Sequence, residues 1–197
     1  MQPHNRQQQA RLLRISRKVH RTTGALLFAF FFVVSVTGLL LGWKKNSGGY
    51  IMAKSHSGTS TNLADWLPID SLHRNALRIY RDSIRAGGSP ALDRIDIRQD
   101  KGMVKFVFVD GFWGIQLDGA TGRLLHIEKR RSDFIEKVHD GSILDHYFGT
   151  GSVIKLIYTT VMGIALLVFT VTGFWLWYGP GRMRRQAARS RSGAGAS

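Results

Sequence analysis

Seven histidines and no cysteine set the limits on metal chemistry in this 197-residue chain. The absence of cysteine removes disulfides, thiolate metal sites, iron–sulfur clusters and covalently attached c-type haem. A bound metal or cofactor would therefore be held by histidine, methionine, tyrosine or carboxylate groups. The histidines of most interest stand at the edges of two long apolar runs: His20 precedes the first run, and His139 and His146 precede the second.

These histidines also have a structural interpretation. His20 has Lys18 and Arg21 beside it, and basic side chains often gather at the ends of membrane spans. His139 stands at the end of a short predicted helix, where Asp140 could accept a hydrogen bond from its ring. We assign no role to the remaining histidines, which are His4, His56, His73 and His126.

The chain carries none of the common catalytic sequence motifs. It has no Ser/His/Asp arrangement, zinc-protease motif, phosphate-binding loop or dinucleotide fingerprint. A self-contained nicotinamide- or flavin-dependent reductase is thereby disfavoured, and any electrons would come from a cytoplasmic or membrane donor. A transporter is also disfavoured, because two spans without interior ionisable residues line no pathway.

Two apolar runs are long enough to cross a membrane. Residues 24–43 and 156–178 carry no charged side chain, and about twenty apolar residues span the ~30 Å hydrocarbon core. Trp43 closes the first run, and Pro180 follows the second and is expected to end that helix. The first run exceeds the ~7–15 residues of a signal-peptide core and no small-residue cleavage site follows it, so we expect an uncleaved anchor.

The net charge of +15 is concentrated outside these runs. All thirteen acidic residues lie between Asp65 and Asp145, whereas the flanks before residue 24 and after residue 181 are basic and contain no acid. Such flanks hold the ends of a span in the cytoplasm. They fit anionic lipid headgroups better than nucleic acid. We therefore expect an in–out–in hairpin, with basic cytoplasmic tails over 1–21 and 180–197 and transmembrane helices over 22–43 and 153–179.

Between the spans lies a segment with the patterns of a small folded domain. Residues 44–64 are rich in Gly, Ser and Thr and are predicted to be a linker. Apolar residues at helical spacing predict a helix over 65–86, and alternating β-formers predict strands after it. The predicted strands are 91–98, 103–109, 113–117 and 123–127. We expect a helix packed on an antiparallel sheet over 65–131, an α+β domain, followed over 132–152 by a juxtamembrane helix (132–139) and a loop.

Several segments resemble one known family. The strand pair WGIQLDGATGRLL and the order of the loop elements resemble a PepSY domain. His20-Arg21 before the first span, KVHDGSI at 137–143 and VTGFWLWY at the end of the second span resemble the PepSY-associated transmembrane helix family. The resemblance covers most of residues 17–180. It implies a bacterial inner-membrane protein, a two-helix transmembrane hairpin whose inserted PepSY-like domain faces the periplasm.

The resemblance also implies a cofactor and an activity. Members of this family include inner-membrane reductases that carry haem b and reduce ferric siderophores in the periplasm. His20 and His139 match the family's histidines and would be axial ligands of haem iron, with His146 as a further candidate for cofactor binding. Those reductases usually have four or more spans, whereas this chain has two and looks like a half-size relative.

Distance along the helices restricts how haem iron could be held. A span of twenty-odd residues, at about 1.5 Å per residue, would put His20 about 30 Å from His139, so the two cannot share one iron. On the outer face His146 could be the second ligand beside His139. Alternatively, a homodimer would bring two copies of each histidine together across a two-fold axis. Gly38 and Gly42 form a GxxxG, which permits close helix approach.

Two functions remain open at this point. One is a haem-b electron-transfer protein of the inner membrane that supports reduction of periplasmic ferric iron or ferric siderophores, as a ferric reductase or a subunit of one. The other is a cofactor-free PepSY regulator tethered to the membrane, which would inhibit a peptidase or scaffold a membrane complex. Histidines at both membrane faces favour the first, because a regulator has no need of them.

Overall fold

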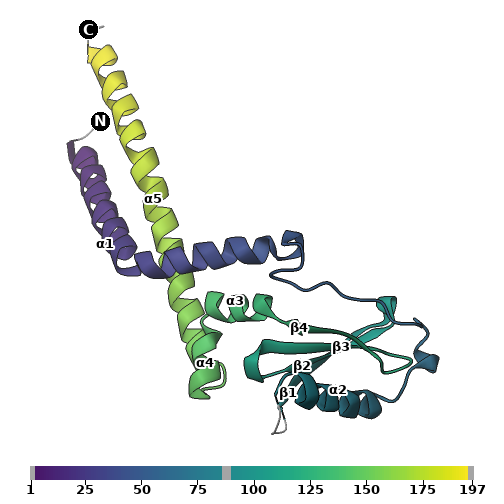
Figure 1. Cartoon of the computed structure of the whole chain (residues 1–197). Helices are drawn as coiled ribbons and strands as arrows, with labels where there is room; N and C mark the ends of the chain where they lie inside the picture. The colour runs from purple at the N-terminus through teal and green to yellow at the C-terminus, as the bar shows by residue number, and fades with distance from the viewer. Residues whose placement is uncertain (1–2, 86–89, 195–197) are drawn as a thin grey trace. The chain divides into compact units, whose positions relative to one another are not determined.

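The computed structural model describes residues 3–85 and 90–194, and the chain falls into two compact units (Figure 1). The helical unit contains Met1–Val36 and Asp140–Ser197, and the loop-domain unit contains Thr37–His139. The two long helices are α1 (Pro3–Gly42), which continues from the first unit into the second, and α5 (Val153–Ala194). Each unit is described by itself.

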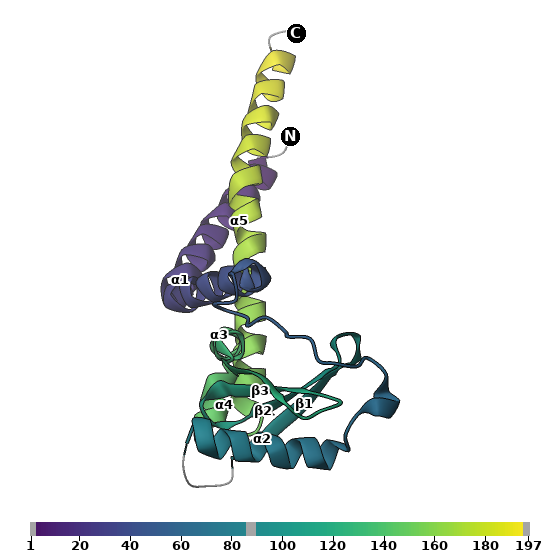
Figure 2. The ribbon, with the colours of Figure 1, turned by 45° about the vertical axis from the view of Figure 1, so that its right-hand side comes forward.

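In the helical unit, α1 and α5 pack in antiparallel directions. Leu13 of α1 lies against Gly179 of α5, and further along α1 the ring of Phe30 lies 6.2 Å from the ring of Tyr158. Residue numbers thus fall along α5 as they rise along α1, and α1 bends part-way along its length (Figures 1 and 2). The second predicted apolar run lies inside α5, and the first lies inside α1 except for its last residue, Trp43, which confirms the hairpin of two membrane helices.

The apolar side chains of both long helices face outward. Only 6% of the most apolar stretch of either helix is buried, which suits contact with lipid and not a soluble core. Thr37 is 8% exposed and is the one buried side chain among those of α1 that the structure describes. A buried polar residue on an otherwise lipid-facing helix requires a hydrogen-bond partner, and it marks a special position.

The prediction that Pro180 ends the second helix is wrong. The helix α5 continues through Pro180 to Ala194 (Figure 1). Proline has no N–H and so removes one backbone hydrogen bond, the one to the carbonyl of Leu176. Gly179 and Gly181 flank the proline and have no side chains to crowd its ring, so the helix accommodates that single loss.

A short helix and a capped turn precede α5. Gly141 has a φ of +78°, which ends α3 (Arg131–His139) and starts α4 (Ser142–Phe148). The buried carboxylate of Asp145 then accepts hydrogen bonds from the backbone N–H groups of Ile154 and Lys155 at 3.0 and 2.8 Å. It therefore satisfies two of the free N–H groups at the start of α5.

The loop-domain unit contains a four-stranded antiparallel sheet whose strands follow one another in chain order, β1-β2-β3-β4. The strands are β1 (Leu92–Arg98), β2 (Met103–Phe108), β3 (Trp113–Asp118) and β4 (Leu124–Lys129). All four strands and the helix after them lie where the sequence predicts them. The helix α2 (Ile69–Ser83) covers one face of the sheet, so the α+β prediction is confirmed (Figure 1). The last residue of the predicted 65–86 helix lies outside the described residues.

The core lies between α2 and the facing side chains of the strands. Its fully or almost fully buried members are Leu72, Ala76, Tyr80, Val104, Phe106, Phe108, Ile115 and Leu117. On α2 these residues recur every four positions, and on β2 and β3 every second position, as a helix on a sheet requires. Burial of one large side chain such as Phe106 contributes about 2–3 kcal/mol.

Residues 44–64, predicted as a linker, run along the sheet. The backbone N–H of His56 donates to the Gln116 side chain at 3.0 Å, and the N–H of Gly58 donates to the carbonyl of Lys101 at 2.7 Å. The N–H of Thr59 donates to the Asp118 carboxylate at 3.2 Å. The segment before α2 is therefore bonded to β3 and to the β1–β2 turn.

Candidate functional site

The ring of His20, on α1, lies against the interior of the second apolar run. Its Nδ1 is 3.1 Å from the hydroxyl of Thr172 and 3.1 Å from the carbonyl oxygen of Phe169, both on α5. The imidazole stacks on the Phe169 ring, with centroids 3.8 Å apart and planes at 25°. Gly173 makes room for it, because a Cβ there would lie 3.2 Å from Cε1 of His20.

The hydrogen bonds of His20 define where its proton sits. A carbonyl oxygen can only accept, so the contact with Phe169 requires the proton on Nδ1. The hydroxyl of Thr172 donates to the carbonyl of Val168 at 2.7 Å and so also accepts from His20. In the neutral imidazole the other ring nitrogen, Nε2, then carries the lone pair, and among the described residues it makes no hydrogen bond.

His139, the last residue of α3, makes a similar contact inside the loop-domain unit. Its Nδ1 lies 2.9 Å from the hydroxyl of Thr37, the buried residue of α1. A Cβ on Gly38 would lie 3.5 Å from Cε1 of His139. The first glycine of the GxxxG is thus covered by this imidazole. In the described part of the chain the His139 ring has no hydrogen bond at Nε2 either.

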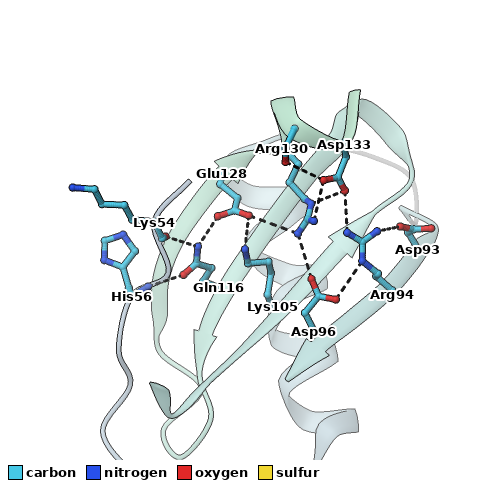
Figure 3. Close-up of polar contacts among 11 residues, drawn as sticks. Lys54, His56, Asp93, Arg94, Asp96, Lys105, Gln116, Glu128, Arg130 and Asp133 are labelled. Atoms are coloured by element: carbon cyan, nitrogen blue, oxygen red, sulfur yellow. Dashed lines mark hydrogen bonds and ion pairs between the residues drawn. The ribbon is translucent and has the colours of Figure 1, made fainter. Parts of the chain in front are cut away.

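A network of ion pairs fixes the start of α3 to the sheet (Figure 3). The guanidinium of Arg130 makes two hydrogen bonds to Asp133, at 2.8 and 3.0 Å, and Arg94 of β1 adds a third at 3.0 Å. Burial raises the pKa of Asp133, but the hydrogen bonds and charges of Arg130 and Arg94 lower it more, so the pKa is below its ordinary value. Six residues after Asp133 along α3 stands His139.

The network continues across the face of the sheet opposite α2. Glu128 of β4 is 5% exposed and pairs with Lys105 at 2.8 Å, and Gln116 donates to it at 2.5 Å. The other Gln116 contacts hold residues 54 and 56, as Figure 3 shows. A backbone hydrogen bond also joins α3 to the segment before α2, since the N–H of Ser132 donates to the carbonyl of Ile51 at 3.0 Å. The strands and the segment before α2 thus position α3, and with it His139.

His146 lies on α4 in the helical unit, with its ring edge-on to Tyr147 at 5.5 Å. Its neighbour Asp145 is bonded to the first turn of α5, and about 17 helical residues, or ~25 Å, separate that turn from Thr172. His146 and His20 therefore stand toward opposite ends of α5 and cannot share one metal ion.

The carboxylates around α4 have structural partners. Asp140 pairs with Lys155 at 2.6 Å and accepts from the N–H of Ser142, so it is bonded to its own helix start and to α5. Burial raises the pKa of Asp145, but hydrogen bonds from the Thr150 hydroxyl and from the first turn of α5 lower it more. These groups stay ionised at neutral pH and fix α4 on α5.

The geometry limits the chemistry of the two imidazoles. Among the described residues there is no cluster of three or more His, Asp or Glu side chains that could hold a metal ion. The described residues thus offer too few ligands for a bare metal ion, whereas haem brings four nitrogen donors and needs only axial ligands. Trp175, one turn after Thr172 on α5, has a buried Nε1 without a hydrogen-bond partner in the part of the chain that the structure describes. Such a donor suits an anionic group, and it lies one turn along α5 from the threonine that contacts His20.

We predict His20 and His139 from the sequence, but not the threonines that lie against their rings. A signal for both is present: the triplet Val-Thr-Gly occurs at 36–38 and again at 171–173. Each triplet contacts one of the two candidate histidines.

Comparison with known protein families gives a match over most of the chain. A family model described as the PepSY-associated TM region matches residues 17–196, which is most of the chain. No curated protein matches the chain significantly.

Proposed function

The chain belongs to the PepSY-associated TM family, and we propose that it is a haem-b electron-transfer protein of the bacterial inner membrane. In this proposal the loop-domain unit faces the periplasm and both basic ends face the cytoplasm. Electrons from a cytoplasmic or membrane donor would cross the bilayer and reduce ferric iron or a ferric siderophore on the outer side. The chain would act as a ferric reductase or as a subunit of one.

The observation that carries the proposal is the state of two imidazoles. His20 and His139 each make their described hydrogen bonds through Nδ1, to Thr172 and Thr37 respectively. An imidazole held at Nδ1 presents Nε2 in a fixed direction, which is how histidine ligands are usually prepared for a metal. His20 and His139 would be the axial ligands, and the Nε1 of Trp175 would donate to a carboxylate of the cofactor.

Haem b, when bound, carries one electron at a time between its ferric and ferrous states. The residues of the chain would hold and surround the two histidines. Phe169 and Gly173 shape an apolar, stacked surface around the His20 ring, and this keeps water away from it. The α3 helix and its ion pairs hold His139 against α1. The loop domain would also present the surface at which the ferric substrate docks.

A second axial ligand at His20 has to come from elsewhere. The other histidine whose side chain the structure describes in the helical unit is His146, toward the opposite end of α5. In our proposal a second copy of the chain supplies the missing imidazole across a two-fold axis. The second copy would supply the second ligand of His139 in the same way.

The test is a visible spectrum of detergent-purified full-length protein, oxidised and dithionite-reduced. The wild type from haem-replete cells should show a b-type spectrum. His20→Ala and His139→Ala should each remove about half of the haem, and the double variant all of it, if each residue serves its own haem. His56→Ala is the matched control, because that histidine is exposed in the loop domain, and it should retain full haem content.

The haem-to-chain ratio tests the dimer. Two haems shared across a two-fold axis give about one haem per chain, whereas independent sites give about two. A colourless wild type from haem-replete cells would overturn the electron-transfer proposal and leave the cofactor-free regulator.

A further inference from the structure

The two candidate histidines are held by the same three-residue sequence in two unrelated settings. Val171-Thr172-Gly173 on α5 receives His20 from α1, and Val36-Thr37-Gly38 on α1 receives His139 from α3. In both places the threonine hydroxyl meets Nδ1, and the glycine following it meets Cε1. A single contact of this kind could be incidental packing. Here the same two imidazole atoms, Nδ1 and Cε1, lie against the threonine and the glycine of both triplets.

The chemistry of a threonine inside a helix explains the pairing. The hydroxyl of Thr172 donates to the carbonyl of Val168, one turn earlier, at 2.7 Å, and this leaves its oxygen as an acceptor. We infer the same arrangement for Thr37, which also lies inside a helix. An acceptor beside Nδ1 favours the tautomer with hydrogen on Nδ1 and a lone pair on Nε2. At Gly173 the absent side chain also lets the ring approach closely, since a Cβ there would lie 3.2 Å from Cε1 of His20.

We propose that Thr37 and Thr172 are positioning residues that set the tautomer and orientation of His139 and His20, so that each ring presents the lone pair of Nε2. The tautomer part of this inference is independent of any cofactor. Its consequence for haem rests on the function proposed above. There, a hydrogen-bonded Nδ1 makes the imidazole a stronger electron donor, which stabilises the ferric state and lowers the reduction potential.

The surroundings predict unequal effects at the two sites. Nδ1 of His20 has a second acceptor, the carbonyl of Phe169 at 3.1 Å, which remains when Thr172 is changed. The described hydrogen bonds of His139 include only the one to Thr37. Thr37→Val should therefore change the tautomer of His139 more than Thr172→Val changes that of His20.

The chain also offers matched controls. Thr159 and Thr170 lie on α5, and their hydroxyls donate to the carbonyls of Lys155 and Leu166, both at 2.8 Å. Both side chains are exposed and neither contacts a histidine. Thr170→Val thus removes the same backbone hydrogen bond from the same helix without touching an imidazole.

The experiment measures ¹⁵N chemical shifts of labelled histidines in full-length protein made without haem. His20→Gln and His139→Gln assign the two rings. We expect the wild type to show both as the Nδ1–H tautomer, and each Thr→Val variant to convert its own histidine, partly or wholly, to the Nε2–H form. Thr37→Ser and Thr172→Ser keep the hydroxyl and should restore the wild-type shifts. Thr170→Val should leave both rings unchanged.

Haem-loaded protein gives the second readout. Loss of an outer hydrogen-bond partner typically weakens metal affinity about 10- to 100-fold, so we expect that loss of haem affinity, and a raised reduction potential, for each Thr→Val variant. If both Thr→Val variants keep the Nδ1–H tautomer, the positioning role is overturned whether or not haem binds. If the tautomers shift as expected but wild-type protein binds no haem, the positioning role stands and the electron-transfer proposal fails.

Discussion

His20 and His139 are each bonded to a threonine through Nδ1, but the structures that support them differ. His20 lies between the two membrane helices, with a ring stacked on it and two oxygen acceptors beside it. His139 reaches Thr37 from α3, and α3 is fixed by the sheet and by the segment before α2. The first site is thus made by the span pair, and the second depends on a folded loop domain.

This difference suggests what the loop domain is for. A two-helix hairpin can hold one histidine by helix packing, because both partners belong to long helices. His139 instead needs a rigid support within the loop-domain unit, because it stands on α3. The ion pairs from Arg130 and Arg94 to Asp133 provide that support (Figure 3). The loop domain therefore has a positioning role for His139.

The variant with the largest expected effect destabilises the loop domain. It tests whether the His139 site depends on that domain while the His20 site does not. Phe106 is fully buried between α2 and the sheet, and Phe106→Ala should cost about 3–5 kcal/mol of unfolding free energy. Hydrogen–deuterium exchange should show loss of protection in residues 92–129, with α5 unaffected. In the histidine spectrum the His139 signal should change and the His20 signal should persist.

A matched control for this variant is Leu124→Ala on β4, because that side chain is 43% exposed. It should leave both signals in place. Equal loss of the His20 and His139 signals in Phe106→Ala would contradict the view that the span pair makes the first site by itself.

A smaller effect on stability distinguishes Gly38, beside His139, from Gly173, beside His20. Gly→Ala inside a helix gains up to about 1 kcal/mol of helix propensity. At Gly38 the new Cβ would meet His139 at 3.5 Å, an ordinary contact, so the variant should be neutral or slightly stabilising. At Gly173 the Cβ would lie 3.2 Å from His20, and crowding should cost about 1–2 kcal/mol and displace the ring.

Thermal unfolding in detergent and the histidine ¹⁵N shifts measure these two variants. Gly163→Ala is the control, because nothing lies within 4 Å of a Cβ at that position of α5. It should report helix propensity alone. If Gly173→Ala behaves like Gly163→Ala in both measurements, the close packing of His20 on α5 is refuted.

The elements of the fold are predictable because their signals are local. Period-2 alternation of β-formers locates all four strands, and uninterrupted apolar runs locate both spans. The start of α2 is misplaced by four residues for a local reason as well. Pro68 disfavours helical geometry in the residue before it, so the helix begins at Ile69.

The partners of the candidate histidines are not predictable in this way. His20 and Thr172 are 152 residues apart, and His139 and Thr37 are 102 apart, so no periodicity links them. The repeated Val-Thr-Gly is visible in the sequence, but glycine and threonine are common in membrane helices. Only the three-dimensional contacts show that each triplet faces an imidazole. The role of residues 44–64 is hidden for the same reason, since Gly and Ser composition indicates flexibility and carries no record of hydrogen bonds to the sheet.

The smallest expected effect tests the link between the ion pairs and His139. The pKa of Asp133 is lowered, because Arg130 and Arg94 favour its charged form. Its contribution to stability is therefore fully present above the unfolded-state pKa of about 3.9 and is lost as the pH falls through the lower folded-state value. Asp133→Asn should remove about 1 kcal/mol at pH 7, and the stabilities of variant and wild type should converge as the pH falls below the folded-state pKa of Asp133.

Urea unfolding of the loop domain between about pH 7 and pH 2 measures this convergence. Asp70→Asn is the control, because its ion pair with Arg74 on α2 is exposed, and that variant should stay within about 0.5 kcal/mol of wild type at every pH. The His139 signal decides what the network is for. If Asp133→Asn broadens or shifts the His139 resonance while leaving that of His20 unchanged, the ion pairs position the second site. If it lowers stability without altering His139, the network only holds the domain together, and the hydrogen bond to Thr37 suffices to place the imidazole.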